Sequence, residues 1–228
     1  VEAVRIFQRN EELMRDGLCR FDHPHDNVEL STRITSTKHS YQDRDRHWAD
    51  GIRRYQITGV TTVQVDSITA ILPLERETAI VLNFGSDTHA GGGVSGGSMA
   101  QEEDLCRSCP ELQRALTNGR YWGKGLYPIQ AQEALVTKGV TVLRTPPTME
   151  VTPGLGKINI VTAAMPRMTE HLLKKYNNTR YRTQALFVPG IKAMLCACAV
   201  AGMKDLVLGP WGCGAFRCDR QEVADAFI

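Results

Sequence analysis

AIVLNFGSDTHAGGGVSGGSMAQEED, residues 79–104, is the stretch from which the fold is predicted. Its first six residues are largely apolar, which is typical of a strand buried on both faces of a sheet. Six of the next fourteen residues are glycine, so the chain can turn there and its backbone can approach a ligand closely. Ser98 is the expected N-cap of a following helix, whose first turns carry Glu102, Glu103 and Asp104.

A strand, a glycine loop and a helix N-terminus together predict an anion site, with phosphate as the expected anion. The Walker motif is excluded, because no Gly-Lys-Ser/Thr closes the loop. Gly91, Gly93 and Gly96 match G-x-G-x-x-G, but the acidic strand end expected about 20 residues later would fall in 111–116, which has a helical pattern. We treat that match as accidental. A flexible Gly/Ser connector followed by an acidic helix start is the alternative interpretation.

The same arrangement occurs again near the end of the chain. Residues 206–208 predict a short buried strand, 209–214 a glycine loop and 219–228 an acidic helix. Two such loops at the carboxyl edge of one sheet would place two anion sites side by side. The sequence therefore predicts binding of a nucleotide that carries a diphosphate.

The remaining segments predict alternating strands and helices around these two loops. The helix after the first loop is expected to end at Asn118-Gly119. Basic and aromatic residues alternate in 21–55, but aspartates offset the charge, so a solvated surface is favoured over a polymer-binding face. Further helices are expected at 1–18, 67–72, 167–176 and 191–201, and further strands at 60–66, 139–144 and 157–163, with a loop at 145–156.

Composition restricts the class of protein. The 228 residues, 42% hydrophobic, predict a single domain, and a net charge of +2 indicates no dedicated nucleic-acid surface. The apolar run at 193–201 is shorter than the about 20 residues of a membrane span, and no signal core is visible, so we expect an intracellular, cytoplasmic protein. The chain stops inside an amphipathic pattern, so we expect it to be truncated at its C-terminus.

The cysteines are predicted to be free thiols. Seven are present, an odd number, and Cys106-x-x-Cys109 has neither a second Cys-x-x-Cys nor histidines at ligand spacing. The sequence predicts no metal site and no cofactor.

Two sequence blocks resemble a known family. The triplet Gly91–Gly93, a seven-residue spacer and Gln101-Glu102-Glu103 resemble the signature of the poly(ADP-ribose) glycohydrolases, and DLCR at 104–107 extends the likeness to their bacterial-type branch. LVLGPWGCGAFR at 206–217 resembles the second phosphate loop of that branch, and 140–144 and 160–164 show weaker likeness. Two positions depart from the family pattern: His89-Ala90 stands where Asn-Pro is common, and Cys218-Asp219 where Asn-Asp is common.

The resemblance implies a macrodomain, a three-layer α/β/α fold with a mixed central sheet. Residues 56–228 would form its core, preceded by an N-terminal helix and an irregular accessory segment at 1–55. It also implies an enzyme that hydrolyses ribose–ribose bonds of poly(ADP-ribose) from the chain end and releases ADP-ribose. We expect a monomer. A reader of ADP-ribose that lacks turnover, and a hydrolase that removes single ADP-ribose units from protein or nucleic acid, are the alternatives.

The resemblance also implies roles for residues. Glu103 would be the catalytic acid/base, and Glu102 would hold ribose hydroxyls. Adjacent glutamates cannot flank one glycosidic bond as the two carboxylates of most glycosidases do, so a single acid/base residue is the consistent mechanism. On their own, the two residues could simply stabilise a helix N-terminus. The ligand-binding residues would be Asn83, Gly91, Gly92, Gly93, Val94, Gln101, Gly212, Cys213, Gly214, Ala215 and Phe216.

Overall fold

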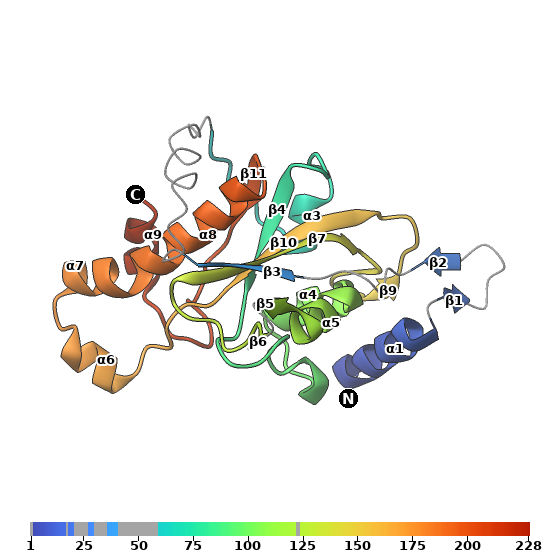
Figure 1. Cartoon of the computed structure of the whole chain (residues 1–228), viewed down its shortest axis with the longest axis horizontal. Coiled ribbons are helices and arrows are strands. Elements are labelled where there is room, and N and C mark those ends of the chain that lie inside the picture. The colour runs from blue at the N-terminus through green and yellow to red at the C-terminus, as the bar shows by residue number, and fades with distance from the viewer. Residues whose placement is uncertain (1, 17, 21–26, 30–35, 41–58, 122–123) are drawn as a thin grey trace.

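A five-stranded mixed sheet forms the centre of the computed structural model, which describes residues 2–16, 18–20, 27–29, 36–40, 59–121 and 124–228. The strand order is β11-β4-β10-β7-β3 (Figure 1). β4 pairs in parallel with both β10 and β11, whereas β7 runs antiparallel to β10 and to β3. The strands are β3 (Ser36–Ser40), β4 (Ala79–Phe84), β7 (Glu133–Thr141), β10 (Lys157–Ala163) and β11 (Asp205–Val207).

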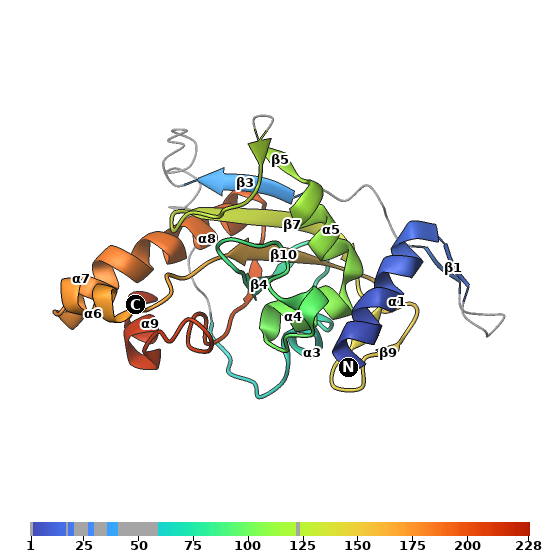
Figure 2. The same ribbon diagram turned by 90° about the horizontal axis from the view of Figure 1, so that it is seen from below.

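Helices cover both faces of this sheet. α3 (Ser67–Ile71), α4 (Gln101–Ser108) and α5 (Pro110–Asn118) pack on one face, and α8 (Val188–Val200) packs against β7 and β10 on the other (Figure 2). The predicted three-layer α/β/α architecture with a mixed sheet is therefore confirmed.

The alternation of side chains along β4 explains its nearly continuous apolar sequence. Val81 points into a core with Leu105 and Leu112 of α4 and α5. Leu82 points into a second core with Met194 of α8. Because both faces are covered by helices, the strand is apolar on both faces except at Asn83, near its end.

The smaller elements surround these layers. α1 (Glu2–Asp16) contacts α4 and α5. The others are β1 (Leu18–Arg20), β2 (Asn27–Glu29), the 3₁₀ helix η1 (Val94–Gly96), β5 (Arg120–Tyr121), β6 (Lys124–Gly125), β8 (Arg144–Thr145), β9 (Glu150–Val151), α6 (Glu170–Lys175), α7 (Thr179–Arg182), the π-helix η2 (Thr183–Phe187) and α9 (Arg220–Ala226).

The helical run Thr179–Val200, which joins α7, η2 and α8, corrects one prediction. This run of 22 residues contains an 18-residue window with a mean hydropathy of 1.5, so it is long and apolar enough to cross a membrane. The shorter run at 193–201 was not expected to be long enough. Half of the 18-residue window is buried inside the molecule. That burial is typical of a core helix, and here it covers the sheet beside β7 and β10.

Two predicted strand boundaries are wrong. Residues 60–66 form no strand, and Val63 and Val65 are exposed. Among the described residues, no strand pairs with this segment. β7 begins at Glu133 and not at Gly139, because this glycine lies inside the strand at a bulge. Its N–H donates to Asn159 Oδ1 at 3.1 Å in place of a regular ladder bond.

The predicted helix start and helix length also need correction. Ala100 and not Ser98 is the N-cap of α4, and the helix breaks at Cys109, because Pro110 starts α5 with a new first turn. The end at Asn118 is as predicted. In the segment expected to be irregular, residues 36–40 form edge strand β3. The side chains of 21–55 lie outside the described residues, so the solvated surface expected there stays a prediction.

Candidate active site

The glycine triplet lies directly beside both acidic side chains. Gly92 has a positive φ of 57°, a conformation that side chains other than glycine rarely adopt. A Cβ at this position would lie 2.5 Å from Glu103 Oε1 and 2.9 Å from Glu102 Oε2. The missing side chain therefore lets the loop backbone touch both carboxylates.

Glu102 is a buried carboxylate at the carboxyl end of β4. Its Oε2 accepts the Ser86 N–H at 2.7 Å, and its Oε1 lies 3.5 Å from Asn83 Nδ2. Burial raises the pKa of Glu102 from 4.5 to about 7, and the charge of Glu103 adds to that rise, while the Ser86 hydrogen bond opposes it. This carboxyl can therefore be neutral near physiological pH.

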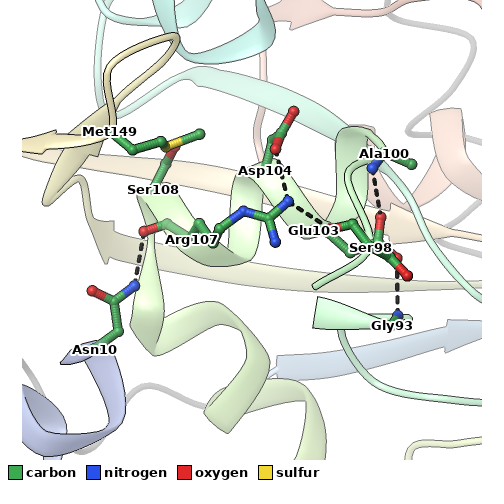
Figure 3. A network of polar contacts seen from close by, with 9 residues as sticks. All are labelled: Asn10, Gly93, Ser98, Ala100, Glu103, Asp104, Arg107, Ser108 and Met149. Carbon is green, nitrogen blue, oxygen red and sulfur yellow. Dashed lines mark hydrogen bonds and ion pairs between the residues drawn. The ribbon is translucent and has the colours of Figure 1, made fainter. Parts of the chain in front are cut away.

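Glu103 is held by the glycine loop and by its own helix start (Figure 3). Its Oε1 accepts the Gly93 N–H at 2.9 Å, and its Oε2 accepts the Ala100 N–H at 3.1 Å. The second bond satisfies a backbone donor at the start of the helix, as in one half of a capping box. Both oxygens are thus oriented by main-chain groups.

Gln101 ties α4 to β4 through the backbone. Its Oε1 accepts the Phe84 N–H at 2.8 Å, and its Nε2 donates to the Leu82 carbonyl at 2.8 Å and to Ser67 Oγ at 3.1 Å. These bonds hold the two glutamates at the end of the strand. The predicted contact of Gln101 with a ligand stays a prediction.

Asn83 and Val94, two further predicted ligand-binding residues, are almost fully buried. Asn83 Nδ2 donates to Thr162 Oγ1 at 3.1 Å, whereas its Oδ1 has no hydrogen-bond partner among the described residues. The side chain of Val94 belongs to the core beneath the loop. Any contact of Val94 with a ligand would therefore involve its backbone.

The second glycine loop lies beside the first because β11 pairs with β4. A Cβ at Gly209 would lie 2.8 Å from the Phe84 ring, which shows how closely the second loop passes the end of β4. Trp211 is buried and anchors the loop, and Gly212 has a positive φ of 79°. The predicted side-by-side position of the two loops is confirmed.

The tip of the second loop is exposed. Gly214 and Ala215 are exposed, and in the described residues their N–H groups donate no hydrogen bond. Cys213 Sγ lies 3.6 Å from the Trp211 carbonyl, and the half-buried Phe216 ring carries the Arg167 guanidinium 5.0 Å above its centre. Free backbone donors of this kind suit an anion such as a diphosphate.

The residues that the structure describes contain no cluster of three or more histidine, cysteine or acidic side chains that could hold a metal ion. Cys106 and Cys109 are free, fully buried thiols, and burial raises the pKa of both well above the usual value. Such thiols are inert.

Sequence reasoning missed a polar network behind Glu103 (Figure 3). Arg107, one turn after Glu103, is buried and donates through Nη2 to the Ser98 carbonyl at 2.7 Å and to Asp104 at 2.9 Å. Ser98 Oγ in turn lies against Gly93, where a Cβ would approach it to 2.4 Å. Arg107 ends the DLCR block and lies one helical turn after Glu103, but neither signal identified its hydrogen-bond partners.

The same network reaches the N-terminal helix. Asn10 of α1, which is 2% exposed, donates to the Arg107 carbonyl at 2.9 Å and accepts from Arg144 Nε at 3.0 Å. These partners lie far apart in the sequence, so no local pattern could have predicted them.

Comparison with known proteins places this site in a family. Residues 8–144 match the family model described as "Microbial-type PARG, catalytic domain". A poly(ADP-ribose) glycohydrolase from Thermomonospora curvata superposes with a TM-score of 0.76 at 19% identity, covering 99% of this chain and 85% of that chain. One from Deinococcus radiodurans, in complex with ADP-ribose, superposes with a TM-score of 0.65 at 26% identity, covering 84% and 79%. A search of curated proteins found no match.

Proposed function

The chain belongs to the family of microbial-type PARG catalytic domains, and from this premise we propose that it is a poly(ADP-ribose) glycohydrolase that releases ADP-ribose from chain ends. One observation carries the proposal: the carboxylates of Glu102 and Glu103 meet at Gly92, on a loop that lies beside a second glycine loop. A reader of ADP-ribose would need the loops but not the pair of carboxylates.

The two loops would hold the diphosphate of the terminal ADP-ribose. The exposed N–H groups of Gly214 and Ala215 are available as donors. The positive φ at position 92 favours glycine, so no side chain separates the backbone of the first loop from a ligand. Backbone donors fixed in this way stabilise negative charge without any reorganisation. Phe216 would pack against the distal ribose, in line with the family resemblance.

Glu103 would act as the acid and then as the base. It donates a proton to the departing ribose oxygen while the bond from the anomeric carbon to that oxygen breaks and an oxocarbenium-like centre develops. Water attacks that carbon and returns a proton to Glu103, which restores the starting state. The Gly93 and Ala100 N–H groups fix its two oxygens throughout.

Glu102 would orient the ribose by hydrogen bonds to its hydroxyls. Ser86 and Asn83 hold the carboxyl in place, and a pKa of about 7 lets it serve as donor or acceptor near neutral pH. Its position on the same side of the loop as Glu103 agrees with attack at a single ribose.

The test is release of free ADP-ribose from three substrates: poly(ADP-ribose), mono-ADP-ribosylated protein and mono-ADP-ribosylated DNA. We expect release from the polymer, lost in Glu103→Gln. Release only from the mono-ADP-ribosylated substrates would show a mono-ADP-ribosyl hydrolase instead. Tight binding of ADP-ribose with no release from any substrate would show a reader.

A further inference from the structure

The positive charge of this chain is concentrated in and around α6 and α7. Residues 167–182 contain five arginines and lysines and one acidic residue, a net charge of +4, whereas the whole chain carries +2. The rest of the chain is therefore negative overall. A polyanion would therefore be attracted to this segment more strongly than to the rest of the chain.

Most of these cations form no ion pair with a carboxylate of the described residues. Lys174, Lys175 and Arg180 are exposed, and within the part of the chain that the structure describes they form no ion pair with a carboxylate. Arg182 differs, because its Nε donates to Glu222 of α9 at 2.8 Å. The unpaired cations are free to bind an external anion.

Two aromatic rings lie among these cations. The rings of Tyr176 and Tyr181 stack with their centres 5.7 Å apart, and Lys175 Nζ lies 5.3 Å from the centre of the Tyr176 ring. Tyr181 is 62% exposed. An exposed tyrosine beside cations is the arrangement with which proteins stack a nucleobase next to its phosphates.

This segment is continuous with the second glycine loop. The Met168 N–H donates to the Phe216 carbonyl at 2.8 Å, and Arg167 stacks on the Phe216 ring. The Arg182–Glu222 pair joins α7 to α9, the helix that follows the loop. Both views show α6, α7 and α9 gathered at one end of the molecule (Figures 1 and 2).

We propose that the surface formed by Arg167, Lys174, Lys175, Arg180 and Tyr181, the α6–α7 surface, binds the units of poly(ADP-ribose) that follow the unit being released. This inference rests on the proposed function. Each repeating unit carries a diphosphate and an adenine, which match the free cations and the exposed tyrosine. The remaining polymer departs from the distal ribose, beside Phe216, where the surface begins.

The test compares long poly(ADP-ribose) with the ADP-ribose dimer as substrates. Lys174→Glu combined with Lys175→Glu should raise KM for the long polymer about tenfold, because phosphate contacts are lost. For the same reason, KM of this double variant should increase less steeply with salt concentration than KM of the wild type. We expect kcat and affinity for ADP-ribose to stay within about twofold. KM for the dimer, which supplies only one following unit, should rise clearly less than KM for the long polymer. Tyr181→Ala should also raise KM for the long polymer, and Tyr181→Phe should restore it because stacking is kept.

A matched control reverses two charges at the opposite edge of the sheet. Lys157 and Lys204 are exposed at the amino ends of β10 and β11, so Lys157→Glu with Lys204→Glu changes net charge equally but leaves the α6–α7 surface intact. Equal effects of the two double variants, or an equal rise in KM for dimer and polymer, would overturn the proposal. Failure of the wild-type chain to release ADP-ribose from either substrate would instead overturn the proposed function, and the surface with it.

Discussion

Glu102 and Glu103 are neighbours on one helix, yet the structure gives their carboxylates different partners. Ser86 and Asn83 hold Glu102 at the strand end, whereas Gly93 and Ala100 hold Glu103 at the glycine loop. Identical chemistry in different settings should produce different roles.

We predict an asymmetry between the two glutamine variants. Glu103→Gln cannot transfer the proton, so kcat should fall roughly 10²–10⁴-fold while affinity for ADP-ribose barely changes. Glu102→Gln removes an orienting carboxyl, so both turnover and binding should weaken. Steady-state kinetics on poly(ADP-ribose) and calorimetric titration of ADP-ribose separate these roles. Near wild-type turnover of Glu103→Gln would contradict its catalytic assignment.

Gly92→Ala should disrupt the site at a single atom. The new Cβ meets both carboxylates, and the positive φ costs about 1–2 kcal/mol for any other residue, so we expect affinity for ADP-ribose to drop at least about tenfold. Gly96→Ala in the same segment is the matched control, because nothing lies within 4 Å of its Cβ position. Equal affinities of both variants would mean that the triplet is only a connector.

At the scale of elements, Arg107 connects α4 to the first glycine loop, because its side chain donates to the Ser98 carbonyl. Arg107→Met loses hydrogen bonds from a charged group to Ser98 and Asp104, so the free energy of unfolding should fall by about 1.5–3 kcal/mol. Because Ser98 packs on Gly93, and Gly93 orients Glu103, kcat should fall as well.

Urea denaturation and kinetics on poly(ADP-ribose) measure both effects of Arg107→Met. Arg5→Met is the control, since Arg5 also pairs with an acidic residue three positions away but is exposed. If stability falls while kcat and KM stay unchanged, Arg107 supports the fold alone and does not position the catalytic helix.

Elements with strong local patterns could be predicted from the sequence. The apolar run of β4 and the glycines after it identified the strand and the first loop, and the shorter run at 206–208 identified the second. The alternation at 60–66 was misleading, because a strand also needs a partner, which periodicity does not report. The break at Cys109 was missed because the helical pattern continues through Pro110.

The residues that hold the two glutamates in place could not be predicted either, because their contacts join distant parts of the sequence. Asn10 is an unremarkable polar residue on a charged helix, and only the fold brings it to Arg107 and Arg144. The raised pKa of Glu102 likewise arises from burial, which depends on how α4 packs against β4. The glutamate pair itself was identified from its motif, but the atoms that orient it were not.

For the molecule as a whole, Glu102 links stability to pH. Its pKa is about 7 in the folded state and near 4.5 when exposed, so between these values folding takes up a proton. The free energy of unfolding should therefore fall by about 3 kcal/mol as pH rises through this window. Glu102→Gln lacks this dependence. Urea titrations of both proteins at several pH values test it, and parallel curves would show that Glu102 does not titrate in this range.

The neighbouring positions of β4 and β11 have a consequence for the chain while it is being made. During translation β4 and its glycine loop emerge early, but the strand that completes their edge of the sheet emerges near residue 205. A ribosome-bound chain short of that point has only one of the two glycine loops that are proposed to hold the diphosphate. If both loops are needed, ADP-ribose should stabilise this protein only after residues 205–207 have left the ribosome.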